Sequence, residues 1–343
     1  MFPPSRAPSD SAVRSTDADA LLSRVSAAKH AYLADAFSPL FLTPAQRKST
    51  EPRPPLINIG THARTWAVDA LVEQFLATRE AVQVLSLGAG TDSRFWRMRQ
   101  RWTDTRGAES WPCRNWVEVD FPEATGAKAR TIATKAELKS QLGGDLKVEQ
   151  GGLGLSSPLY TLLPGDLRDL DLLSSSLLAP RDASSPSPPR LDPTLPTLIL
   201  LECVLVYLAP ETTDGLLSLC ASTFPAAAVV SYDPFGLDDS FGQVMKRNLA
   251  MRGLSLPGAA STPTLASLSR RLRSNGFAGP SDSLSIKQIR ESIIPLDELE
   301  RVNKIEQIDE VEELNLVLDH YAVTWGHVGS SADEGPALAL CAR

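Results

Sequence analysis

The chain has 343 residues, of which 43% are hydrophobic and 22% are charged, and its formal net charge is −7. This length allows one elaborated α/β domain with a sizeable core, and the acidic balance gives no general basic field for nucleic acid or a membrane. The four cysteines are far apart, with no metal-type cluster, so a reducing compartment and no metal site are expected. No segment is long and apolar enough to span a bilayer. The composition therefore predicts a cytoplasmic or nucleocytoplasmic protein.

The first twenty residues are rich in Pro, Ser and Asp and contain no apolar core. They are predicted to form a disordered tail rather than a secretory signal. Residues 21–343 are expected to form a single domain that begins with a helical cap over residues 21–80. Within this cap, apolar residues recur at helical spacing over residues 21–42, up to Pro39, and again over residues 61–79.

Short apolar runs then alternate with helical segments. Four of them end at or near polar residues, namely AVQVLSL (81–87), WVEVD (116–120), TLIL (197–200) and AAAVVSYD (226–233). Near-continuous apolar runs are typical of a parallel sheet that is covered on both faces. The glycine-rich stretch between Leu138 and Pro158 is interpreted as a loop or insertion, and residues 174–196, of low complexity, as a mobile surface loop.

The C-terminal third has a different pattern. TLASLSRRLRSNGF (264–277) is predicted to be a helix that stops at Asn275-Gly276. SIKQIRE (285–291) and HYAVTWGHV (320–328) resemble late strands, antiparallel to one another at one edge of the sheet. Two acidic amphipathic helices are expected between them. The whole pattern predicts an α/β fold with a doubly wound, mostly parallel sheet, N-terminal helices and a C-terminal helical insertion.

The stretch VLSLGAGTDSRFW (84–96) runs from a predicted strand into a glycine turn. A dinucleotide fingerprint requires a third glycine, and this chain has Ser93 there. Asp92 would repel a pyrophosphate, but it would favour a cofactor that carries an amino group and a sulfonium. The loop therefore indicates S-adenosylmethionine rather than NAD or ATP. An ordinary tight turn at Gly88 and Gly90 is the alternative.

Acidic residues follow three of the predicted strands. Asp120 stands where a carboxylate can accept hydrogen bonds from ribose hydroxyls, or where it could cap a helix. Asp166 and Leu167, in a Gly-Asp-Leu sequence, supply a carboxylate and an amide that could read an adenine. Glu202 ends the most apolar strand, where a doubly wound sheet keeps its site. Burial of an unpaired glutamate is costly, so Glu202 is interpreted as functional, with a structural ion pair as the alternative.

The segments LGAGTDSRFWR, EVDFPE, GDLRDL, PTLILLECVLVYLAPE and SNGF closely resemble the leucine carboxyl methyltransferases. The resemblance runs from about Ser26 to the last strand. It implies a class I, Rossmann-like methyltransferase with a seven-stranded sheet and S-adenosylmethionine as cofactor. It further implies that the protein methylates the C-terminal leucine carboxylate of the type 2A protein phosphatase catalytic subunit. The cofactor contacts that it implies are Lys29, Arg64, Gly88, Asp120, Asp166, Leu167 and Glu202.

This chain lacks one arginine of the family pattern. Ile59 replaces the family's first arginine in the segment INIGTHART, which leaves Arg64 as the guanidinium that would bind the cofactor carboxylate.

Arg168 and Tyr207 are the candidates for holding the acceptor carboxylate. Their alternatives are a surface ion pair of Arg168 with a following aspartate and a packed ring at Tyr207. An ionised carboxylate needs no general base, so the task of such an enzyme is positioning in a water-poor pocket.

Other activities are compatible with the same motifs. The alternative is a related methyltransferase that acts on a small-molecule carboxylate or on a modified tRNA base, although the acidic balance weighs against RNA. A non-enzymatic scaffold that binds the cofactor is a further alternative, against which the presence of Arg64 and Glu202 argues. The expected partner is the phosphatase tail, with no nucleic acid and no membrane, and the protein is expected to be a monomer.

Overall fold

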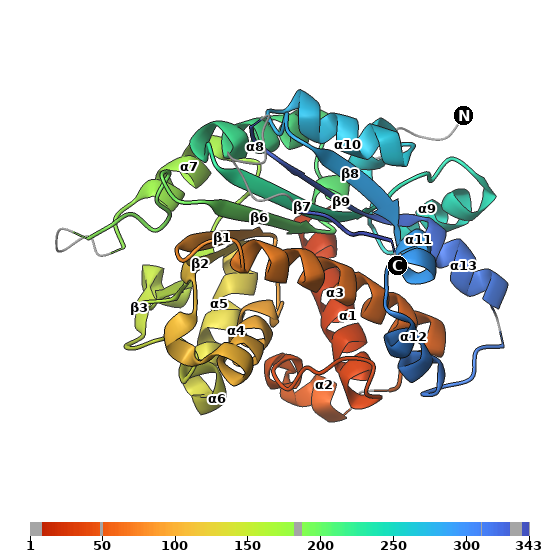
Figure 1. Ribbon diagram of the computed structural model, residues 1–343, viewed down its shortest axis with the longest axis horizontal. Coiled ribbons are helices and arrows are strands. Elements are labelled where there is room, and N and C mark those ends of the chain that lie inside the picture. Colours follow the sequence, from red (N-terminus) through yellow and green to blue (C-terminus); the bar gives the residue numbers. More distant parts are fainter. Residues whose placement is uncertain (1–8, 49–50, 182–186, 310, 330–337, 343) are drawn as a thin grey trace.

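The computed structural model describes residues 9–48, 51–181, 187–309, 311–329 and 338–342. Its centre is a nine-stranded sheet with the order β3-β4-β5-β2-β1-β6-β7-β9-β8, and helices cover both faces (Figure 1). The strands are β1 (Val82–Leu87), β2 (Cys113–Asp120), β3 (Lys147–Glu149), β4 (Gly154–Ser156), β5 (Tyr160–Pro164), β6 (Thr197–Glu202), β7 (Ala227–Pro234), β8 (Ser281–Ser285) and β9 (Tyr321–His327).

The middle of the sheet is parallel. β1 pairs with β2 on one side and with β6 on the other, so that Leu85 lies beside both Val117 and Ile199. β5 and β7 extend this parallel part outward, and β9 is inserted antiparallel between β7 and β8. The predicted doubly wound α/β sheet is confirmed. Its seven strands are extended at one edge by the short strands β3 and β4, which lie in the glycine-rich stretch interpreted as a loop.

Helices lie on both sides of this sheet, and two apolar clusters fill the space between them. In Figure 1, α3, α4 and α5 lie below the sheet, and α7, α8 and α10 lie above it. Val84 of β1 packs on the first side and Leu85 on the second, as alternation along a strand requires. The helices are α1 (Asp10–Lys29), α2 (Pro44–Lys48), α3 (Pro55–Leu76), α4 (Arg94–Arg106), α5 (Pro122–Thr134), α6 (Ala136–Lys139), α7 (Leu170–Leu178), α8 (Pro210–Thr223), α9 (Ser240–Met251), α10 (Leu265–Ser274), α11 (Ile286–Ser292), α12 (Leu296–Asn303) and α13 (Val311–Asp319).

The N-terminal prediction is wrong for residues 10–20, which belong to α1. Ser9 caps this helix by accepting a hydrogen bond from the N–H of Ala12 (3.3 Å). The second half of the helix buries Leu21 and Val25 in the core. The helix ends at Lys29, so the helical prediction for residues 21–42 is correct only in its first part. Residues 1–8 of the predicted tail lie outside the described part of the chain.

The prediction of a mobile loop over residues 174–196 is wrong for residues 174–178, while the other described residues of this segment lie outside helices and strands. Residues 174–178 form the end of α7, and Leu191 is fully buried in the core. The N–H of Arg190 donates to the carbonyl of Ala179 (2.9 Å), so the two ends of the segment lie together. Residues 182–186 lie outside the described residues.

One late element has a different structure from the one predicted. The segment 285–291 was expected to be a strand, but β8 ends at Ser285 and α11 begins at the next residue. Ser285 and Gln288 form a capping box in which each side chain accepts the backbone N–H of the other residue. Two other late predictions are confirmed, because α10 stops before Gly276, whose φ is +98°, and α12 and α13 are the two acidic helices. β9 does have an antiparallel partner at this edge, but the partner is β8 rather than residues 285–291.

Candidate active site

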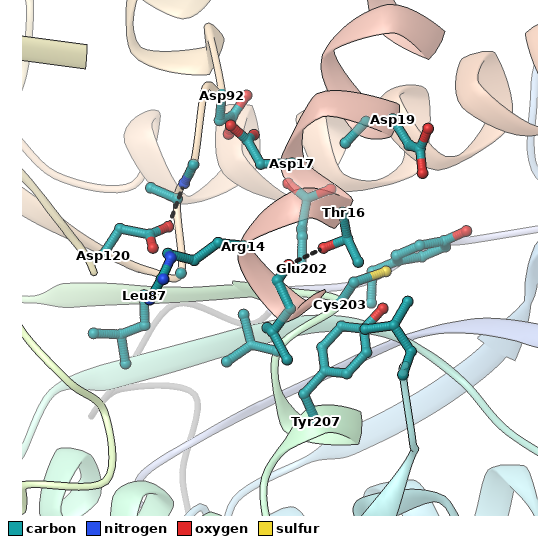
Figure 2. Close-up of a pocket in the computed structure, with 18 of the residues that line it drawn as sticks. Arg14, Thr16, Asp17, Asp19, Leu87, Asp92, Asp120, Glu202, Cys203 and Tyr207 are labelled. Carbon is teal, nitrogen blue, oxygen red and sulfur yellow. Dashed lines mark hydrogen bonds between the residues drawn. The ribbon is translucent and has the colours of Figure 1, made fainter. Parts of the chain in front are cut away.

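A cavity of about 700 Å³ lies at the carboxyl ends of the parallel strands (Figure 2). Its walls include Gly88 after β1, Asp120 at the end of β2, Asp166 after β5 and Glu202 at the end of β6. The helices α1 and α3 contribute further wall residues, among them Arg64. Ligands of open α/β sheets bind at this edge. The sheet therefore brings most of the predicted cofactor residues to one space.

The glycine turn after β1 is held in a conformation that favours glycine. Gly88 has φ +66°, and a β-carbon there would lie 2.5 Å from a methyl group of Val204. Gly90 has φ +46°, and its N–H donates to Asp120 Oδ2 (2.6 Å). The second oxygen of Asp120 accepts the N–H of Phe121 (2.7 Å). This turn therefore exposes backbone to the cavity, and it is tied to the end of β2.

Asp120 has an unusual environment for a carboxylate. Its burial raises the pKa of the group, and the N–H groups of Gly90 and Phe121 act against that shift. The following helix, α5, starts without a side-chain cap, so the helix-capping alternative for Asp120 does not apply. The carboxylate lines the cavity and organises the glycine turn at the same time.

Glu202 is bound by two arginines. Arg64 Nε donates to Glu202 Oε2 (2.7 Å), and Arg94 Nη1 donates to the other oxygen. Burial disfavours the charged carboxylate, but Arg94 and Arg64 outweigh it and lower the pKa of Glu202. The ion pair considered as the alternative for Glu202 is thus present, in the wall of the cavity itself.

Arg64 lies between Glu202 and an aromatic ring. Its guanidinium carbon is 4.4 Å from the ring centre of Tyr232, a cation–π geometry. Burial disfavours its charge, but Glu202 outweighs this effect and raises the pKa of the guanidinium. Among the described residues only the Nε of Arg64 is hydrogen-bonded. Its two Nη groups therefore retain donors for a ligand carboxylate.

Arg94, which was not predicted to be a site residue, connects the glycine turn to the core. Arg94 is 3% exposed, and it donates to Asp69 Oδ1 (2.8 Å) and to Asp92 Oδ2 (2.7 Å). Burial disfavours the charge of Asp92, but Arg94 and neighbouring cations outweigh it and lower the pKa of the carboxyl group. Asp92 lines the cavity as a charged group, although Arg94 compensates part of its charge. The signal available in the sequence was the spacing of Arg94 and Arg97, which share one face of α4.

A buried ion pair lies behind the glycine turn. Lys128 of α5 contacts the carboxylate of Glu118 on β2, and both side chains are 1% exposed. Lys128 Nζ also donates to the carbonyl of Asp92 (2.8 Å), and the hydroxyl of Tyr160 donates to Glu118 (2.7 Å). The lysine thus links the turn to the adjacent helix and strand.

Arg168 lines the cavity, but two carboxylates already occupy its guanidinium. Its guanidinium binds both Asp166 and Asp10, with contacts of 2.5–3.0 Å. Arg168 follows β5 and Tyr207 follows β6, and β2 and β1 lie between those strands. Three strand spacings amount to roughly 14 Å between the two strand ends, so the two side chains enter the cavity from different sides. The surface-pair alternative was correct in kind, but the partners are Asp166 and Asp10.

Of the remaining predicted residues, two line the cavity and one does not. Leu167 and Tyr207 line the cavity, and burial raises the pKa of Tyr207, so its hydroxyl remains protonated at neutral pH. Lys29, the last residue of α1, is exposed and does not line the cavity. Arg24, earlier on the same helix, does line it and donates to Thr91 Oγ1 (2.9 Å). Lys29 as a cofactor contact therefore stays a prediction, and Arg24 is a second cation of the same helix that faces the cavity.

Three further features were checked against the described residues: Ile59, possible metal ligands and possible membrane-spanning helices. Ile59, where the resemblance implies an arginine in the family, is 1% exposed and belongs to the core. In the described ranges, no group of three or more His, Cys, Asp or Glu residues could hold a metal ion. In the same ranges no helix is long and apolar enough to cross a membrane.

The wall chemistry fits S-adenosylmethionine. The glycine turn presents Gly88 and Gly90, which have no side chains, to the cavity. Carboxylates surround the cavity at Asp92, Asp120 and Glu202, which suits a cofactor with an amino group, a sulfonium and ribose hydroxyls. Arg64 lines the same cavity, and a guanidinium is a suitable partner for a carboxylate such as that of the cofactor.

Comparison with known proteins gives consistent results. The family model described as leucine carboxyl methyltransferase matches residues 5–221. A relative from Cryptococcus neoformans, leucine carboxyl methyltransferase 1, is 43% identical, covering 95% of this chain and 96% of the relative. tRNA wybutosine-synthesizing protein 4 of Rattus norvegicus is 34% identical over 98% of this chain, but only 47% of that protein is covered. A solved structure of a putative methyltransferase from Thermobifida fusca has a TM-score of 0.51 at 16% identity, covering 94% of this chain and 96% of that chain. The last likeness concerns the fold alone.

Proposed function

The chain belongs to the leucine carboxyl methyltransferase family, and on that premise we propose that it methylates the C-terminal leucine carboxylate of a type 2A protein phosphatase catalytic subunit. S-adenosylmethionine is the methyl donor of this family. The observation that carries the proposal is the cavity at the carboxyl ends of the strands. Its wall contains the hydrogen-bonded pair Arg64 and Glu202 together with the glycine turn.

We propose that residues after different strands contact different parts of the cofactor. Asp166 and Leu167, after β5, would read the adenine, and Asp120, at the end of β2, would accept hydrogen bonds from the ribose. Arg64 would bind the carboxylate of the cofactor's methionine part, with Glu202 keeping the guanidinium in place and compensating its charge. Gly88 would let the cofactor lie against the backbone.

When bound, S-adenosylmethionine supplies a methyl group on a positively charged sulfur. The acceptor carboxylate is already ionised at neutral pH, so no residue of this chain has to remove a proton. The work of the chain is to orient one carboxylate oxygen and to exclude water. Tyr207 is proposed as the hydroxyl donor that orients the acceptor. The cavity wall beside it is apolar at Val204, Leu208 and Leu254, which restricts water.

The direct test uses labelled S-adenosylmethionine with the phosphatase catalytic subunit, either complete or lacking its final leucine. We expect label on the complete subunit and none on the truncated one. Equal labelling of both, or of neither, would contradict the proposal. A Glu202→Gln variant is the matched control for the source of the label, because its labelling should fall strongly.

The rat relative involved in wybutosine synthesis gives a reason to test a second acceptor. A tRNA fraction should be offered in the same assay. The net charge of −7 gives little attraction for a polyanion, so we expect no label on RNA. Label on tRNA with an unlabelled phosphatase would favour the second function.

A further inference from the structure

The helix α1 takes part in the cavity, although the sequence of its first half predicts a tail. Its residues Asp17, Ala20 and Arg24 are in the cavity wall, and Figure 2 shows Asp17 between the helix and the loop that carries Asp92. Asp17 and Arg24 are seven residues apart, which places them on one face, two helical turns from each other. This face is directed at the glycine turn.

Both residues bind the same side chain, that of Thr91. Asp17 Oδ1 accepts the backbone N–H of Thr91 (2.8 Å) and its hydroxyl (2.7 Å). Arg24 Nη2 donates to the same hydroxyl oxygen (2.9 Å). A guanidinium only donates and a carboxylate only accepts, so the polarity of these bonds is determined. The hydroxyl accepts from Arg24 and donates to Asp17.

The contact continues into the turn itself. Thr91 follows Gly90, whose N–H is held by Asp120 from the opposite side. A β-carbon at Gly90 would collide with the carboxylate of Asp17. Two successive N–H groups are therefore fixed by two carboxylates, one from β2 and one from a helix more than seventy residues earlier in the chain.

We infer that Asp17 is a positioning residue for the cofactor site: it acts through Thr91 to hold the glycine turn in its binding conformation. The inference rests on the proposed function, because it takes the turn to be the cofactor site. It assigns to α1 a role in cofactor affinity rather than in acceptor recognition. The Asp17 carboxylate acts on the turn, and it acts equally whether or not the bound cofactor carries the methyl group.

The test measures the dissociation constants of S-adenosylmethionine and S-adenosylhomocysteine by calorimetry on the full chain. Asp17→Ala removes two hydrogen bonds to a charged acceptor and should weaken both ligands by about tenfold or more. Thr91→Val should have a similar effect, and Thr91→Ser should restore affinity because it keeps the hydroxyl. Ser15→Ala is the matched control. Ser15 is an exposed residue of the same helix, and its side chain donates to the carbonyl of Ala12.

A kinetic measurement separates positioning from general loss of structure. Asp17→Ala should raise the KM for S-adenosylmethionine while leaving the KM for the acceptor unchanged. If Asp17→Ala binds both ligands like the wild type, or if Thr91→Ser is as weak as Thr91→Val, the inference is wrong. A loss confined to S-adenosylmethionine would also overturn it, in favour of direct contact between Asp17 and the sulfonium.

The same measurements distinguish this inference from the proposed function. A wild-type protein that binds neither ligand would overturn the cofactor assignment, and the inference with it. A wild type that binds both ligands but labels no phosphatase would contradict only the proposed acceptor. If Asp17→Ala does not fold, the comparison of Thr91→Val with Thr91→Ser still decides the question.

Discussion

Replacement of Lys128 by methionine should lower the free energy of unfolding by about 3–5 kcal/mol, the typical cost of breaking a buried ion pair. The structure places this variant in that range rather than in the range of surface pairs, because Lys128 and Glu118 are each 1% exposed. In the variant, the hydroxyl of Tyr160 is the remaining side-chain donor to Glu118 among the described residues. The carbonyl of Asp92 also loses its contact with the ammonium group.

The variant should also acquire a pH dependence. Burial already raises the pKa of Glu118, and Lys128 opposes that shift, so the pKa should rise further without the lysine. A carboxyl group whose pKa is higher in the folded than in the unfolded state loses stability as pH rises through the folded value. Urea unfolding of Lys128→Met should therefore show lower stability at about pH 8 than at about pH 6.

A double variant provides the control. Adding Glu118→Gln to Lys128→Met removes the buried charge and should recover most of the loss at about pH 8, because neither partner is left charged and unpaired. A loss below about 1 kcal/mol in the single variant, with no dependence on pH, would refute this reasoning. It would mean that water or a rearranged neighbour replaces the lysine.

Three further outcomes are expected. Gly88→Ala should weaken S-adenosylmethionine binding by at least about tenfold in calorimetry, because φ is +66° and the new methyl group would meet Val204. Arg64→Ala should weaken the same binding by about tenfold or more through the loss of a charge-assisted contact, with a small change in melting temperature, because Glu202 keeps its second arginine. Asp233→Asn should stabilise the protein more at about pH 8 than at about pH 6, measured as melting temperature. Burial raises the pKa of Asp233 to about 7, so the wild type loses stability as pH rises through that value.

Each of these has a result that would contradict it. Gly107→Ala is the matched control for the glycine, because its φ is +85° and a β-carbon there meets nothing within 4 Å. It should lose stability without losing affinity, and equal affinity losses in both glycine variants would point to strain alone. Unchanged affinity in Arg64→Ala would remove that residue from the site. A stability difference for Asp233→Asn that does not vary with pH would mean that the carboxyl group does not titrate in this range.

The sheet could be predicted because its strands are buried on both faces. Strands such as β1 and β6 therefore appear as continuous apolar runs, which need no knowledge of their partners. The strand β8 could not be found in this way. Its residues Ser281–Ser285 are mostly small and polar, and they lie in the sheet because β9 pairs with them. In that region the alternation of apolar and polar residues in SIKQIRE wrongly indicated a strand. The spacing of Ser285 and Gln288, which is that of a capping box, correctly indicated the start of a helix.

The first half of α1, residues 10–20, was missed for a related reason. It is polar, and its stabilising partners are distant in sequence. Asp10 pairs with Arg168, 158 positions away, and Asp17 with Thr91, 74 positions away. Composition indicates disorder when such partners cannot be seen.

Within the site, position along a strand was a better guide than residue type. Asp120 and Glu202 were found because strand ends converge at one edge of the sheet. Arg168 was assigned from residue type next to Asp166, and sequence proximity does not give the direction of a side chain. The structure directs its guanidinium to Asp10 and Asp166.

The order of strands has a consequence for how the chain is synthesised. The last strand among the described residues, β9, pairs with both β7 and β8. Until residues 321–327 are available, β7 has an open edge and β8 has no strand to pair with. Unpaired edges are templates for aggregation, and pairing between distant segments is slow. Nascent or C-terminally truncated chains should therefore depend more on chaperones than the finished protein does.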